Sequence, residues 1–90
     1  MEDILNLVKE CLGIIPTATA KDNEIKLLID TAIADMERLN IRINLASPMQ
    51  QSAIIQYVKS NFGMLDEKVK ELSFNSYNLL VSSLQMDSRE

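Results

Sequence analysis

Hydrophobic residues recur at helical spacing along most of the chain, and this pattern predicts four helices. The first helix is expected over about residues 2–12 and ends at Gly13. The second begins either at Thr19, whose spacing to Asp22 is that of a capping box, or one turn later at Asp22 itself. The expected inward faces of these two helices contain Ile4, Leu5, Val8, Cys11 and Leu12, and then Ile25, Leu28, Ile29, Ala32, Ile33, Met36 and Leu39.

The third helix has the clearest boundaries. We expect Ser47 to cap it together with Gln50 at its third position, Pro48 to occupy its first position, and Gly63 to end it in the left-handed conformation. Its expected buried face contains Met49, Ala53, Ile54, Tyr57, Val58 and Phe62.

The fourth helix is expected from near Asp66 to about Leu84. The weak helix formers Ser73, Asn75 and Ser76 favour a kink or a break in its middle. Its expected inward positions are Val69, Leu72, Tyr77, Leu80 and Leu84. The core of the whole protein is predicted to include Ile25, Leu28, Ile29, Ala32, Ile33, Val58, Phe62, Leu72 and Leu80.

Residues 40–46 follow a different pattern, because apolar and polar residues alternate there with a period of two. This period indicates extended chain, yet no second strand is predicted that would pair with it. Two interpretations remain. Either the segment folds over the end of the bundle and buries its apolar side chains internally, or a neighbouring subunit supplies part of the cover. On the second interpretation, the candidate subunit-interface residues are Ile41, Arg42, Ile43, Asn44 and Leu45.

The predicted fold class is therefore all-α. We expect residues 1–90 to form one domain, a small bundle of about four helices with an irregular extended loop between the second and the third. With two Phe, two Tyr and no Trp, the core must be mainly aliphatic. A chain of this size buries only about 60 to 65% of its unfolded surface, so oligomerisation is expected. Residues 85–90 are expected to form a flexible polar tail or a docking arm that orders against another protein.

The charge pattern and the composition exclude several classes of protein. The net charge is −4 and the nine basic residues are scattered, which argues against sequence-specific binding of nucleic acid. No apolar stretch is long enough to suggest a membrane span, and no secretory signal opens the chain. A single cysteine forms no internal disulfide, so we expect synthesis in a reducing cytoplasm.

The sequence offers little support for catalysis or metal binding. Without histidine, the usual nucleophile and base pairs are excluded, and one cysteine excludes thiolate zinc sites. The two glycines, Gly13 and Gly63, are too far apart for a phosphate-binding loop. The carboxylate pairs at residues 22/24 and 67/71 lie at charged helix starts rather than in apolar pockets. We expect no enzymatic activity, no cofactor and no metal site.

Three segments carry a resemblance to a known family. The second helix reads DNEIKLLIDTAIADMERLNI, the third ends in YVKSNFG, and SYNLLVSSL follows in the fourth. In this order and separation they resemble the small head–tail connector proteins of tailed bacteriophages, also described as head-completion or DNA-packaging adaptor proteins. The likeness covers about residues 5–84.

This resemblance implies a structural virion protein at the head–tail junction, synthesised in the cytoplasm of the bacterial host. Its subunits are expected to self-associate into a ring below the portal, through which the genome passes and onto which the tail attaches. The implied partners are the portal protein and tail-completion or adaptor proteins. Because the family acts through ring surfaces, the resemblance transfers no catalytic residue.

Two other classes of protein are alternatives to the connector. A small helical protein-interaction module, acting as a regulator or adaptor, fits the same composition and would be monomeric or dimeric. A carrier protein needs an Asp-Ser pair at the start of an internal helix, and the one such pair, Asp87-Ser88, lies in the terminal tail.

Overall fold

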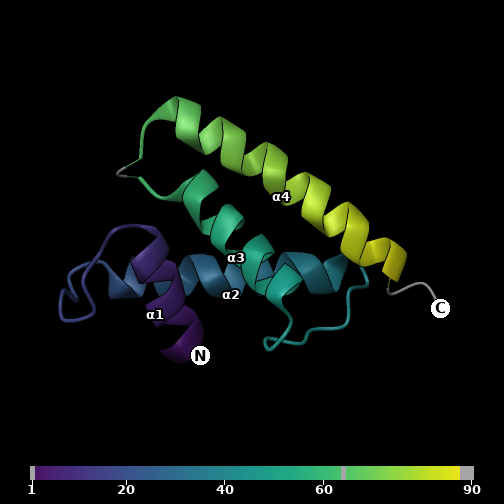
Figure 1. Ribbon diagram of the computed structural model, residues 1–90, viewed down its shortest axis with the longest axis horizontal. Helices are drawn as coiled ribbons and strands as arrows, with labels where there is room; N and C mark the ends of the chain where they lie inside the picture. Colours follow the sequence, from purple (N-terminus) through teal and green to yellow (C-terminus); the bar gives the residue numbers. More distant parts are fainter. Residues whose placement is uncertain (1, 64, 88–90) are drawn as a thin grey trace.

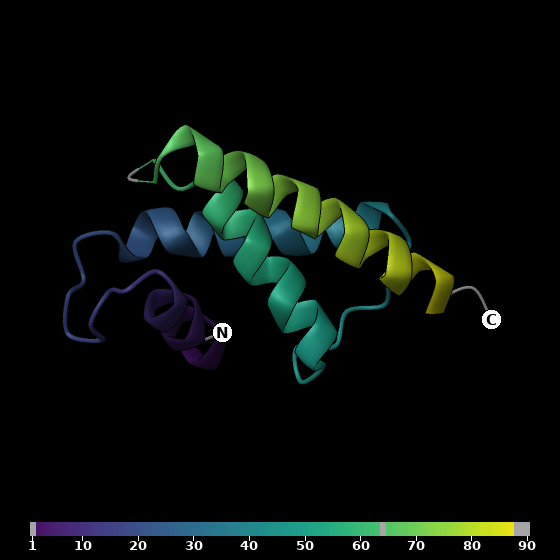
Figure 2. The same cartoon turned by 45° about the horizontal axis from the view of Figure 1, so that its top comes forward.

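Four helices make up the computed structural model, which describes residues 2–63 and 65–87 (Figure 1). They are α1 (Glu2–Cys11), α2 (Asp22–Arg38), α3 (Pro48–Asn61) and α4 (Glu67–Asp87). Within the described residues there is no strand, so the all-α prediction is confirmed. Figures 1 and 2 show α3 in the middle of the molecule, with α2 on one side and α4 on the other.

The core forms around α3, which contacts each of the other helices. Of the nine residues predicted for the core of the whole protein, five are confirmed as buried: Ile25, Ile29, Ala32, Val58 and Phe62. Leu28, Ile33 and Leu80 are half-buried and pack against this core. Aliphatic side chains predominate in the core, as the composition predicted: Ile4, Leu5, Val8, Ile25, Ile29, Ala32, Met36, Ile41, Ala53, Ile54, Val58, Phe62, Tyr77, Val81 and Leu84.

The rotation of α4 about its own axis differs from the prediction. Leu72 is 59% exposed and Val69 is also exposed, whereas Ser73, Val81 and Leu84 face inward with Tyr77. Five positions along a helix correspond to about 140° around it, so Leu72 and Tyr77 cannot share one inward face. The helix is continuous from Glu67 to Asp87, so there is no break at residues 73–76.

Polar contacts of Tyr77 explain why this rotation is selected. Its hydroxyl donates a 2.6 Å hydrogen bond to Asp35 Oδ2 on α2, and its ring meets Tyr57 of α3 edge-on at a centroid distance of 5.1 Å. Burial and the hydrogen bond to Asp35 raise the pKa of Tyr77. The same hydrogen bond lowers the pKa of Asp35, and Arg38 lowers it further. The buried phenol needs this partner, so Tyr77 is held inside and Leu72 turns to solvent.

The first two helices end in the same way. Gly13 has φ 76° and Asn40 has φ 65°, and each follows a helix whose last carbonyls are bonded in the Schellman pattern. After α1, the amides of Ile14 and Gly13 donate to Lys9 O and Glu10 O. After α2, the amides of Ile41 and Asn40 donate in the same manner to Met36 O and Glu37 O. The predicted stop at Gly13 is confirmed.

The end of α3 is different, and the left-handed conformation expected at Gly63 is wrong. Phe62 leaves the helix in the extended conformation, with φ −74° and ψ 120°. This places its ring in the core, where it is 3% exposed. Gly63 then has no positive φ, and its amide donates to Glu24 Oε2 on α2 at 3.5 Å. Burial of Phe62, rather than a glycine turn, directs the chain away from α3.

The helix starts follow the sequence signals more closely. Of the two predicted starts of α2, the structure has the later one, at Asp22, while Thr19 contributes only a backbone turn. The cap at Ser47 is confirmed, since its Oγ accepts from the amide of Gln50. Asp66 caps α4 by accepting from the amide of Val69 at 2.9 Å. The helix continues through residues 85–87 of the expected tail, and residues 88–90 lie outside the described residues.

Two residues that were predicted to be buried, one at the end of α1 and one at the start of α3, are exposed in the structure. The face of α1 that meets the core is centred on Leu5 and Val8, so Cys11 is exposed and Lys9 enters the interior. On α3, Met49 lies in the first turn, beyond the edge of the core, and is 36% exposed.

A buried ion pair joins α1 to the start of α2. The side chain of Lys9 is almost fully buried, and its Nζ lies 2.9 Å from Asp22 Oδ1 and donates to the carbonyl of Pro16 at 3.0 Å. Asp22 Oδ1 is buried and has no hydrogen-bond partner among the described residues. The attraction between the two charges therefore offsets the cost of removing them from water. This pair therefore anchors the loop between the two helices.

Replacing Asp22 by Asn is expected to lower the free energy of unfolding by about 3 kcal/mol, because it leaves the buried ammonium of Lys9 without a counter-charge. Urea denaturation followed by circular dichroism measures this change. Lys9→Met removes the charge itself and keeps the apolar volume, so it is expected to destabilise less than Asp22→Asn. The reverse order would show that the hydrogen bond to Pro16, rather than the charge pair, is the important contact.

Candidate subunit interface

The extended segment predicted at residues 40–46 runs from the end of α2 to the start of α3 across one end of the bundle (Figure 1). Its alternation is confirmed in the burial pattern. Ile41 is 3% exposed, Ile43 and Leu45 are half-buried against the core, and Arg42 and Asn44 are exposed. The apolar side chains thus pack against the protein's own bundle, and the polar ones remain available to another molecule.

Side chains of α3 satisfy the backbone of this segment in place of a second strand. The carboxamide of Gln50 accepts from the amide of Asn44 at 2.7 Å and donates to the carbonyl of Arg42 at 2.8 Å. Gln51 donates to the carbonyl of Leu45 at 2.8 Å. A carboxamide presents one donor and one acceptor side by side, as a peptide group does, so Gln50 takes the place of one peptide unit of a missing strand.

Gln50 was expected only to take part in a helix cap, and sequence reasoning missed this second role. The side chain is 6% exposed, so its two hydrogen bonds lie in a region of low dielectric where an unpaired partner is costly. The signal that points to it is its position three and four residues before Ala53 and Ile54, on the buried face of the predicted helix. A glutamine on such a face needs polar partners.

A turn fixes the end of the segment that leads into α3. Asn44 Oδ1 accepts from the amide of Ala46 at 3.1 Å, and the carbonyl of Asn44 accepts from the amide of Ser47 at 3.0 Å. The second of these partners is the residue that caps α3. The exposed part of the segment is therefore held at both ends before any partner arrives.

An open cleft of about 310 Å³ lies beside this turn, between the segment, α1 and α3. Its lining residues are Asp3, Ile4, Leu7, Leu45, Ala46 and Gln51. Among the described residues that line the cleft, Asp3 is the one ionisable side chain, so these residues supply no acid and base pair for chemistry. Its apolar walls suit the insertion of an apolar side chain from another protein.

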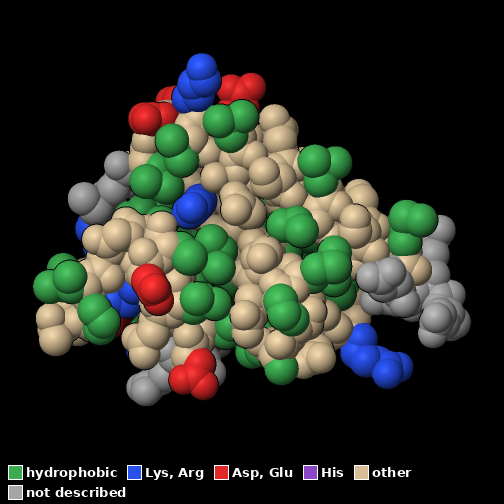
Figure 3. Space-filling model, viewed as in Figure 1, with side chains coloured by type: hydrophobic (Ala, Val, Ile, Leu, Met, Phe, Trp, Pro, Cys, Tyr) green, Lys and Arg blue, Asp and Glu red, His purple; other side chains and the backbone are tan. Residues whose placement is uncertain are grey.

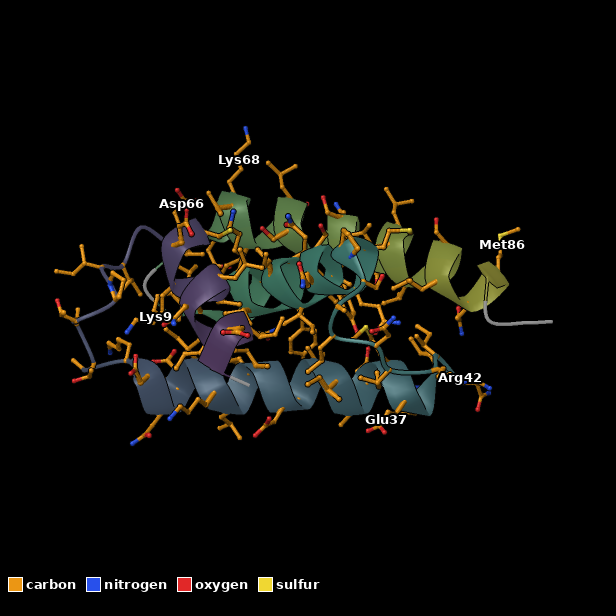
Figure 4. All side chains as sticks on the ribbon, turned by 60° about the horizontal axis from the view of Figure 1, so that its bottom comes forward. Lys9, Glu37, Arg42, Asp66, Lys68 and Met86 are labelled. Carbon is orange, nitrogen blue, oxygen red and sulfur yellow. The ribbon has the colours of Figure 1, made fainter. Side chains whose placement is uncertain are left out.

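The five sequence-predicted interface residues thus have different surroundings. Ile41 is inside the protein, and Leu45 forms part of the wall of the cleft. Figure 4 shows Arg42 projecting into solvent at the end of the molecule where α2 finishes. Of these five residues, those that can meet a partner are Arg42, Asn44 and the uncovered portions of Ile43 and Leu45.

The described part of the chain contains no cluster of three acidic or cysteine side chains that could hold a metal ion. Among the helices that the structure describes, none has the length and hydropathy of a membrane span.

Comparison with known proteins gives one family. A family model described as phage connector protein matches residues 4–87, which include nearly all of the four helices. No curated protein and no solved structure matches the chain. The resemblance found in the sequence is confirmed. The match indicates a structural, non-enzymatic connector role and a place in the virion, in contact with other head or tail proteins.

Gln50→Met keeps the shape of the side chain and is expected to lower the free energy of unfolding by about 3 kcal/mol, since it leaves the amide of Asn44 and the carbonyl of Arg42 unpaired. Gln50→Glu keeps the acceptor and loses the donor. Its penalty should shrink as the pH falls, because a protonated carboxyl regains a donor. Denaturation at several pH values measures both variants. Gln56→Glu, a partly exposed change on the same helix, is the matched control; equal effects at positions 50 and 56 would contradict the proposed role.

Proposed function

Because the chain belongs to the phage connector protein family, we propose that it is a head–tail connector subunit that assembles into a ring below the portal. The genome passes through the channel of the ring, and the tail or a further adaptor attaches to it. The observation that carries this proposal is the extent of the family match, residues 4–87. The match includes nearly all of the four helices, so the proposal concerns the bundle as a unit rather than one motif.

The charge of the protein supports a role beside DNA without binding to it. Thirteen acidic and nine basic residues leave a net charge of −4, and the basic residues form no continuous run in the sequence. An acidic wall repels the phosphates of a genome that moves past it, and this repulsion prevents adhesion. Sequence-specific recognition of nucleic acid is not part of the proposed function.

Residues 40–46 supply one subunit contact in this proposal. A ring is built from heterologous contacts, in which each subunit uses two different patches. The exposed atoms of Arg42, Asn44 and Leu45 lie on backbone that Gln50 and Gln51 already hold in place. A rigid contact loses little conformational entropy on assembly, which favours closure of a ring.

The remaining partners follow from the position of such a ring. Synthesis takes place in the cytoplasm of the bacterial host, and the protein then joins the head–tail junction. There, one rim of the ring contacts the portal and the other contacts tail-completion or adaptor proteins. None of these contacts requires a catalytic residue, a cofactor or a metal.

The purified protein, alone or mixed with the portal of the same phage, is expected to form rings with a central channel. Sedimentation velocity measures the size of the assembly, and negative-stain electron microscopy shows whether it is a ring with a channel. A species no larger than a dimer under both conditions would contradict the connector proposal and favour the small interaction module.

Arg42→Glu is expected to weaken ring assembly and leave the melting midpoint unchanged, because this side chain is exposed and forms no hydrogen bond or ion pair with the residues that the structure describes. Lys26→Glu, an exposed change on α2, alters the net charge by the same amount and should leave assembly intact. Assembly is measured by sedimentation velocity at matched concentrations. If both variants assemble like the parent, Arg42 lies outside the interface; if both lose assembly equally, net charge is the cause.

A further inference from the structure

Charged residues are missing from two long runs of the sequence. Residues 43–58 and residues 72–86 contain no Asp, Glu, Lys or Arg, although such residues make up 24% of the chain. Burial accounts for part of the first run, because α3 is the central helix of the bundle. Burial does not account for the second run, because one side of α4 faces solvent along its whole length. The absence of charge on that exposed side therefore needs another explanation.

The exposed side of α4 carries a stripe of apolar residues and serines, here called the outer face of α4. It consists of Val69, Leu72, Ser76, Leu79, Ser83 and Met86, which follow one another at steps of three and four residues. Leu79 and Met86 are 72% and 73% exposed. Figure 3 shows hydrophobic side chains along the surface of α4 with no charged side chain between them, and Figure 4 shows Met86 pointing away from the bundle.

Such a face has the composition of a protein interface. Single exposed apolar residues are common on any surface, but a stripe of them along one helix is not. The centres of interfaces are depleted of charge and enriched in residues such as Met. A helix that lies on a membrane usually carries Lys or Arg on its polar side, and residues 72–86 have neither. The expected occupant is therefore another protein.

A second surface, with Asp3 as its charged residue, lies at the opposite edge of the molecule. It is called the lower face here and consists of Leu7, Leu45, Ala46, Met49 and Gln51 around the 310 Å³ cleft, together with Asp3, which also lines the cleft. In Figure 1, α4 forms the upper edge of the protein, while the start of α1 and the turn before α3 form the lower edge. The two faces thus differ in structure and lie on opposite sides of one subunit.

We propose that the outer face of α4 on one copy docks onto the lower face of the next copy, an inference that rests on the proposed ring. Two different faces on opposite edges produce a heterologous contact, which repeats from copy to copy and closes when the rotation permits. Residues 72–86 of α4 carry no charge and Asp3 is the charged residue of the lower face, so assembly buries few charges that would have to be desolvated. Residues 40–46 supply Leu45 to this contact, and the cleft receives an apolar side chain of α4.

The length of α4 and the surface area of one subunit are large enough for this contact. A helix of 21 residues is about 31 Å long. A stable interface buries about 800 Å² on each partner. That area is about a seventh of the 5760 Å² surface of one subunit, so two such contacts per copy are compatible with its size.

A mixing experiment distinguishes this contact from its alternatives. Leu79→Glu places a charge on the outer face of α4, and Ala46→Glu places one on the lower face; both side chains are exposed, so both variants are expected to fold. Each variant alone should sediment as a monomer. Their equimolar mixture should contain a heterodimer that grows no further, because one intact contact remains between the two variants. Asn78→Glu, beside the stripe on α4, is the matched control and should assemble like the parent.

Several outcomes would overturn the inference. If Ala46→Glu alone forms a dimer, the contact is two-fold and joins like faces. If both variants remain monomeric when mixed, with melting curves like that of the parent, the two faces do not bind each other. If the parent forms rings and Leu79→Glu forms them equally well, the outer face of α4 is not the interface, and the connector proposal still stands. A parent that forms no ring, alone or with its portal, overturns both.

Discussion

The two hydrogen bonds of the Gln50 carboxamide fix the extended segment at residues 40–46 against α3, and the end of the bundle is built on this contact. They join the backbone of residues 42 and 44 to α3, so an extended segment without a strand partner closes the end of the bundle. Closure brings Ile41 into the core and turns Leu45 and Ala46 toward α1. The wall of the cleft and the exposed position of Arg42 both follow from it. One buried side chain thus connects the stability of the fold with the shape of a proposed subunit contact.

A second buried polar contact decides which side of α4 remains free. The hydroxyl of Tyr77 reaches Asp35 across the bundle, and this contact sets the rotation of α4. With Tyr77 inside, Leu72 and Leu79 face solvent. The same bond that satisfies a buried phenol therefore presents an uncharged stripe on the outside. In the proposed ring, the interior polar contacts of one subunit determine the surface that it offers to the next.

The sequence predicted the features that local signals encode. Helix spacing located all four helices, the residues at 47–50 predicted the cap of α3, and the two-residue period located the extended segment. Features that depend on contacts between distant residues were missed or wrong. Tyr77 and Asp35 are far apart in sequence, and α4 carries two apolar stripes, so periodicity alone does not tell which one faces inward. The burial of Lys9 depends in the same way on Asp22, in the next helix. Of the proposed contact, the sequence indicated the segment at residues 40–46 and not its partner on α4.

Electron cryo-microscopy of the assembled ring, alone or on its portal, shows which faces of neighbouring subunits meet. We expect a closed ring in which the outer face of α4 on each subunit is covered by the first residues of α1 and the turn before α3 of the next subunit. Leu79 would be buried in every contact. A ring in which Leu79 faces solvent or the channel would contradict the proposed contact, and particles without a ring of this protein at the head–tail junction would contradict the connector function itself.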